Sequence, residues 1–152
     1  MRITVLLVLM LSVLASGCKI LGPDDSPPNE LELNQTRWSS YHDGDYHFEV
    51  NRGCFCVNGG SFWVQVVDSK IVFAINNFSQ EPLPDEFLQY FETIDEIFEM
   101  LRNAEKGADE LAVQYSAFGY PSMVTIDWNV LTIDDEMSLT VSNLILGVAL
   151  ID

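Results

Sequence analysis

The sequence contains little positive charge. Seven lysines and arginines stand against 23 aspartates and glutamates, which gives a formal net charge of −16. A surface of this kind repels phosphate backbones, so nucleic acid is excluded as a class of partner. The acidic excess is consistent with a well-solvated surface or with a cationic partner, and we favour solvation because net charge alone does not define a site.

Histidine and the familiar catalytic motifs are also scarce. The chain has two histidines, His42 and His47, and it contains no G-x-S-x-G, no phosphate-binding glycine loop and no H-E-x-x-H. Hydrolase, nucleotide-binding and zinc-protease chemistry each depend on one of these patterns. We therefore expect no catalytic residues, no cofactor and no enzymatic activity.

No apolar run is long enough for a membrane-spanning helix. The longest covers residues 3–14, directly after Met1-Arg2, whereas a helix needs about 20 apolar residues to cross a bilayer. A basic start, an apolar stretch of this length and the small residues Ala15-Ser16-Gly17 are typical of a signal peptide. The sequence predicts an export leader over residues 1–17.

The segment Leu14-Ala15-Ser16-Gly17-Cys18 resembles the lipobox of bacterial lipoproteins, with Ala15 where leucine is more common. The resemblance implies that Cys18 becomes an acylated first residue, and that the lipid bilayer is a partner of the chain. Two or more acyl chains are sufficient for stable anchoring. Lys19 occupies the position where an aspartate signals inner-membrane retention, so we expect an envelope protein, on the outer membrane facing the periplasm if the cell is Gram-negative.

The chain after the leader divides into a tether and one domain. Residues 18–29 hold three prolines and two acids, which predicts an extended linker after the lipidated cysteine. Residues 30–152 are enough for a single domain. The leader carries one cation and no acid, so the mature chain has a net charge of −17.

Residue periodicity predicts an α+β fold, with an antiparallel sheet of about six strands, one main helix and a short N-terminal helix. The short helix covers 30–41, and the main helix begins with a capping box at Thr93 and Glu96 and ends near Gly107. Alternating apolar residues predict strands over 46–57 (with a bulge at Arg52-Gly53), 62–67, 71–75, 111–115, 123–128 and 139–144. Hairpin-like links make the sheet antiparallel. We expect the apolar tail 144–151 to be a docked C-terminus.

Cys54 and Cys56 remain once Cys18 is assigned to lipid. On an extended strand, residues two apart have Cα atoms about 6.6 Å apart, which is near the upper limit for a disulfide. A bend beside Gly53 would let the bond close. A structural disulfide is the interpretation we favour, since exported proteins fold in an oxidising compartment.

Two other roles for the cysteines stay open. A thiol redox centre would require a lowered thiolate pKa, and Arg52 is the only nearby cation. A metal site would combine Cys54 and Cys56 with His42 and His47, although Cys-x-Cys lacks the usual zinc spacing.

Two further segments attract attention. Asp127, Asp134, Asp135 and Glu136 form the densest acidic cluster, which we interpret as a solvated turn, with a calcium site as the alternative. In Gly119-Tyr120-Pro121 the glycine permits a positive φ and the proline fixes the entry to a strand, while the tyrosine is a core or contact residue.

Several short motifs in fixed order resemble a family of uncharacterised bacterial lipoproteins and secreted proteins, known only as a domain of unknown function. The motifs are Trp38, Tyr46-His47-Phe48, Cys54-Phe55-Cys56, Thr93-Ile94-Asp95, Ile97-Phe98, Val113, Tyr115, Gly119-Tyr120-Pro121, Ile126-Asp127 and Asp134-Asp135-Glu136, with Ser116 where an aspartate is expected. The resemblance implies an envelope location and a shared fold, and no reaction. We expect a non-enzymatic domain that binds a protein or another envelope component; the alternative is a redox or metal-linked protein using Cys54 and Cys56.

Overall fold

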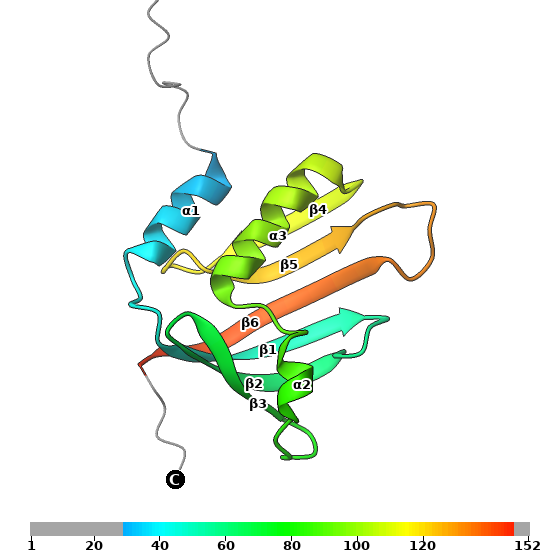
Figure 1. The fold of residues 1–152 in the computed structure, drawn as a ribbon. Coiled ribbons are helices and arrows are strands. Elements are labelled where there is room, and N and C mark those ends of the chain that lie inside the picture. The colour runs from blue at the N-terminus through cyan, green and yellow to red at the C-terminus, as the bar shows by residue number, and fades with distance from the viewer. Residues whose placement is uncertain (1–28, 148–152) are drawn as a thin grey trace, which may run out of the picture.

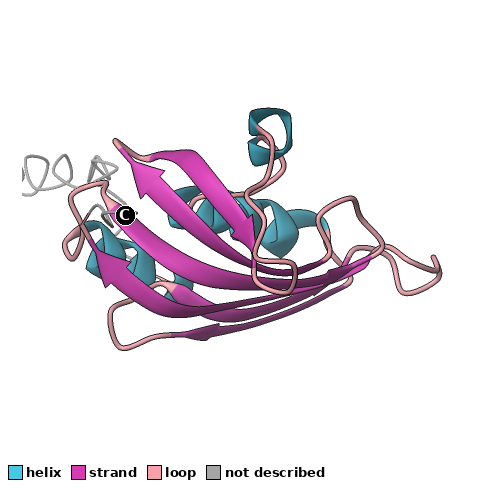
Figure 2. Ribbon diagram, turned by 90° about the horizontal axis from the view of Figure 1, so that it is seen from below, coloured by secondary structure: helices cyan, strands magenta, loops and turns pink. Residues whose placement is uncertain are grey.

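The computed structural model describes residues 29–147, and it has a six-stranded sheet with helices α1 and α3 across one face (Figures 1 and 2). The α+β class and the antiparallel sheet are confirmed. The leader, Cys18 and the C-terminal residues 148–152 lie outside the described residues. The elements are α1 Glu30–Ser39, β1 Tyr46–Cys54, β2 Gly60–Val67, β3 Lys70–Asn76, α2 Asp85–Leu88, α3 Ile94–Gly107, β4 Glu110–Tyr115, β5 Pro121–Asp127 and β6 Glu136–Leu146.

Two three-stranded meanders meet at the centre of the sheet. The strand order is β3-β2-β1-β6-β5-β4, so the first strand pairs with the last. The predicted bulge at Arg52-Gly53 is wrong, because these residues pair in register with β6 up to Cys54 opposite Met137. The register shift falls instead between His47 and Glu49.

The core lies between the sheet and α3. Alternation along β1 turns Tyr46, Phe48 and Val50 towards the helices, where each is buried. The capping box is present: the Glu96 amide donates to Thr93 Oγ1, and the Glu96 carboxylate accepts from the Thr93 amide. The apolar stripe of α3 that follows is fully buried. Burial of such side chains contributes roughly 1.5–3 kcal/mol each.

A buried hydrogen bond fixes the start of α3 on β1. The Ile94 amide donates to the Tyr46 hydroxyl oxygen over 3.0 Å. Ile94 is the first residue of α3, so the bond satisfies one of the amides that have no partner within the helix. Burial holds the pKa of Tyr46 well above its usual range, which keeps this phenol neutral.

The Gly119-Tyr120-Pro121 motif docks α1 against the sheet. Gly119 has φ +95°, and a Cβ atom there would lie 2.3 Å from Asn34 O and 2.8 Å from Trp38 N. The Tyr120 ring meets Trp38 edge to face at 5.9 Å. Pro121 is buried at the first position of β5. The motif is therefore a packing turn, and its tyrosine contributes to the core around Trp38.

A substitution at Gly119 tests this docking. Gly119→Ala should lower the free energy of unfolding by at least about 2 kcal/mol, because the methyl group meets α1 backbone atoms and the positive φ disfavours alanine. Urea denaturation gives the value. Gly107→Ala is the matched control: no heavy atom lies within 4 Å of its added Cβ, so it should leave stability unchanged or raise it. Equal effects of the two variants would disprove the packing role.

Candidate functional site

Cys54 and Cys56 lie in a tight turn between β1 and β2. β1 ends at Cys54, so the predicted continuation of the strand to residue 57 is wrong. The chain bends at Phe55, which brings the two Cα atoms to 5.2 Å, and the cysteines form a disulfide. The bend removes the geometric difficulty of an extended Cys-x-Cys pair.

The disulfide turn presents apolar side chains to solvent. Phe55, between the two cysteines, is 86% exposed, and Val57 is also exposed. Large apolar side chains that lie together on a surface are typical of interaction sites. Beside the turn is a cavity of about 300 Å³ lined by Arg52, Cys56, Val57, Asn58 and Tyr90.

The loop between β5 and β6 lies next to this turn. Cys54 pairs with Met137, so the end of β1 adjoins the start of β6, and both connections project from the same end of the sheet (Figure 1). In the β5–β6 loop Leu131 is 91% exposed and Ile133 84%, and Val130 is exposed as well. We call residues 55–59 and 128–135 together the loop end.

The loop end carries negative charge only. Its two segments contain Asp134 and Asp135 and no lysine, arginine or histidine. Arg52, the cation nearest to the disulfide turn in sequence, is buried: its Nη2 lies 2.6 Å from Glu92 Oε2, and its Nη1 donates to Tyr90 O. Two of its nitrogens are therefore engaged within the domain, while Nε, in a side chain that lines the cavity, has no hydrogen-bond partner among the described residues.

Two carboxylate oxygens at the base of the β5–β6 loop have no hydrogen-bond donor among the described residues. They are Asp127 Oδ1 and Asp135 Oδ1, and both are buried. Partial desolvation, followed by the charge of Asp135, raises the pKa of Asp127. Asp127 pairs across the strands with Glu136, so three of the four clustered acids lie close together.

The described residues bring together no group of three or more histidine, cysteine, aspartate or glutamate side chains that could hold a metal ion. His42 stacks on Trp38, and His47 packs against Trp63. Neither the calcium interpretation of the acidic cluster nor the metal interpretation of the cysteines gains a geometric basis.

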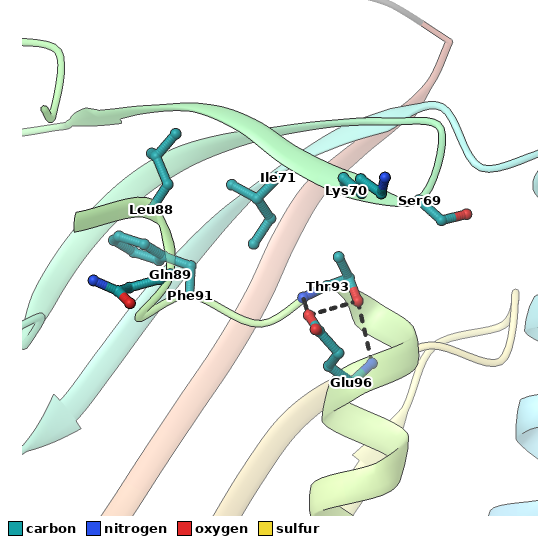
Figure 3. Close-up of a pocket in the computed structure, with 8 residues that line it drawn as sticks. All are labelled: Ser69, Lys70, Ile71, Leu88, Gln89, Phe91, Thr93 and Glu96. Atoms are coloured by element: carbon teal, nitrogen blue, oxygen red, sulfur yellow. Dashed lines mark hydrogen bonds between the residues drawn. The ribbon is translucent and has the colours of Figure 1, made fainter. Parts of the chain in front are cut away.

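A second hollow lies where α3 begins (Figure 3). Its volume is about 220 Å³, and its lining includes Lys70, Ile71, Phe91 and the capping-box residues Thr93 and Glu96. The dashed hydrogen bonds in Figure 3 join Thr93 to Glu96. Thr93 and Glu96 therefore satisfy each other's hydrogen-bonding groups, and the rest of the polar lining consists of Ser69, Lys70 and Gln89.

The apolar part of the loop end was not anticipated from the sequence. The acids of residues 132–136 predict a solvated turn and carry no information on the apolar residues around them. The signal was present in Val130, Leu131 and Ile133, three large apolar residues within a connection between strands. Solvent-exposed turns ordinarily favour small and polar residues.

The fold and the loop end define a small α+β domain with an exposed apolar, acidic tip. The chain belongs to a family of unknown function (DUF6174), whose model matches residues 30–146, from the first residue of α1 to the last residue of β6. No curated protein and no solved structure matches it. None of the described helices is long and apolar enough to cross a membrane.

The raised pKa of Asp127 gives a pH-dependent prediction. A carboxyl with a raised pKa in the folded state costs stability when it ionises, so the cost is present at pH 7 and disappears below the ordinary aspartate pKa of about 3.9. Asp127→Asn should therefore raise Tm at pH 7 and leave it unchanged near pH 3. Glu86→Gln, at an exposed position on α2, is the control. A lower Tm for Asp127→Asn at pH 7 would contradict the assignment.

Proposed function

We propose that the protein is a lipid-anchored component of the bacterial cell envelope, held by acylated Cys18, whose domain binds a protein partner through the loop end. The anchor rests on the leader and on the lipobox-like segment before Cys18. The binding role rests on one observation, the cluster of exposed apolar side chains on two neighbouring loops. Burying such a cluster against a partner is favourable because apolar surface leaves water.

The position of α1 supports this arrangement. Gly119 contacts α1 from the turn before β5, whereas the β5–β6 loop follows β5, so α1 and the loop end lie at opposite ends of that strand. The tether predicted over residues 18–29 leads into α1 at Glu30. An extended tether joined at the α1 end leaves the loop end free to face away from the membrane.

The anchor is tested by lipid labelling in a bacterial host. The wild-type chain should incorporate labelled palmitate and sediment with membranes, and Cys18→Ser should lose both properties because it has no thiol to acylate. A Cys54→Ser/Cys56→Ser variant, which keeps Cys18, should be labelled like wild type. Membrane-bound, labelled protein from Cys18→Ser would refute the anchor.

Thiol–disulfide exchange through Cys54 and Cys56 is a second candidate function. The observation in its favour is access, because Cys56 is exposed in a turn at the tip of the domain. The electrostatics are less suitable, since a reactive thiolate needs a nearby positive charge and the Arg52 guanidinium is already paired with Glu92.

A redox titration separates a structural disulfide from a reactive one. Thiols are counted by mass spectrometry on the mature chain after equilibration in buffers of defined potential. We expect the Cys54–Cys56 bond to resist reduction to about −300 mV, as structural disulfides do. The Cys54→Ser/Cys56→Ser variant should stay folded and lose roughly 1–2 kcal/mol, because the bond closes a very short loop. A bond that opens near −200 mV or above would make exchange the leading function.

A further inference from the structure

Resting on the proposed binding function, we infer that the partner of the loop end is a protein surface with an apolar centre bordered by lysine or arginine. The apolar centre is required by the exposed side chains of Phe55, Val57, Leu131 and Ile133. Protein interfaces place such side chains in a desolvated middle and polar groups around them.

The cavity beside the disulfide turn provides a place for an anchor residue. It measures about 300 Å³ and is lined by Cys56, Val57 and Asn58 of the turn together with Arg52 and Tyr90. Tyr90 is itself exposed, so the cavity is open at the surface. Binding energy at interfaces concentrates where an apolar or aromatic side chain fills such a pocket.

The cationic border follows from the carboxylates. Asp134 and Asp135 lie within the loop end and Asp127 and Glu136 flank it, with no positive side chain in either loop. Asp127 Oδ1 and Asp135 Oδ1 receive no hydrogen bond within the described domain. A guanidinium or ammonium group of a partner placed beside these carboxylates would offset the repulsion between them.

The same charges disfavour the other occupants of an apolar tip. Two copies of this chain would bring identical acidic rims together, which opposes association. Anionic headgroups would be repelled in the same way. A partner with positive charge around an apolar centre is attracted by both features of the loop end.

The site is presented by rigid elements. The disulfide turn follows β1 and the β5–β6 loop precedes β6, and these two central strands pair residue by residue up to Cys54 and Met137. The disulfide further restricts the turn that carries Phe55. A turn fixed in this way loses little conformational freedom on binding.

The experiment uses three fluorescent amphipathic peptides of about 18 residues, a length that forms a helix on binding. They are built from leucine and lysine, from leucine and glutamate, and from serine and lysine. The protein is the mature chain, residues 18–152, with Cys18→Ser to keep it free of lipid. Affinities are measured by anisotropy in about 0.1 M salt, where surface charges are still felt over roughly 10 Å.

The leucine–lysine peptide should bind at least about tenfold more tightly than either other peptide, which corresponds to about 1.4 kcal/mol. Leu131→Gln should lower the affinity for the leucine–lysine peptide about tenfold, and Ile133→Gln should lower it to a similar extent. Leu33→Gln makes the same change at an exposed position on α1 and should have no effect. Asp134→Asn/Asp135→Asn should weaken the leucine–lysine peptide only. Circular dichroism checks that each variant is folded.

Four results would overturn the inference. Equal effects of Leu131→Gln and Leu33→Gln would place the attraction outside the loop end. Binding to zwitterionic vesicles that is lost in Leu131→Gln would show that the apolar tip enters membranes. Equal affinity for the leucine–lysine and leucine–glutamate peptides would remove the charge requirement. No binding of any peptide would show that the loop end does not attract an apolar, cationic surface.

The proposed function is tested apart from the partner's charge. A photo-crosslinking amino acid replaces Leu131 or Leu33 in the full lipidated chain in its host. A protein adduct formed from position 131 and not from position 33 would uphold a protein-binding loop end even if the cationic border were disproved. No adduct from position 131 would overturn both.

Discussion

The pairing of β1 with β6 is the interaction on which the rest of the structure depends. The two strands are far apart in sequence: the Asn143 side chain donates to Glu49 across 94 residues. Closing so long a loop costs chain entropy, and burial of Tyr46, Phe48 and Val50 under the helices offsets it. Without this pairing each meander would end in another unpaired strand edge. The loop end exists because the same pairing sets the end of β1 beside the start of β6.

Helix α3 packs on strands of both three-stranded meanders and so connects them. At its start Ile94 is bonded to Tyr46 of β1, and further along Phe98 stacks near Tyr115 of β4 at 6.3 Å. One helix therefore covers strands from both meanders, and its capping box fixes where that cover begins. The loop end lies beyond this core, at the tips of strands whose positions the core determines.

Local patterns in the sequence predict the helices and strands, but they do not predict which strands pair with each other in the sheet. The capping box at Thr93 and the alternation from Tyr46 to Val50 each depend on adjacent residues, and both were correct. Periodicity indicates which face of a strand is buried, but not which strand pairs with it. The sequence therefore gives no indication of the β1–β6 pairing. Cys54 to Val57 was assigned to a strand because alternation carries no signal for a bend. α2 has four residues, too few for any periodicity. The acids of the candidate site were identified, and its apolar half was not.

The acidic charge of the chain allows the loop end to expose apolar side chains without self-association. Exposed residues such as Phe55 and Leu131 would favour self-association in a neutral protein, since two tips could bury them together. A net charge of −16, with Asp134 and Asp135 in the same loop as Leu131, opposes that encounter and keeps copies apart. Solubility and partner choice are then not competing interpretations of the charge. The carboxylates that repel a second copy are the groups that would admit a cationic partner, so one feature serves both purposes.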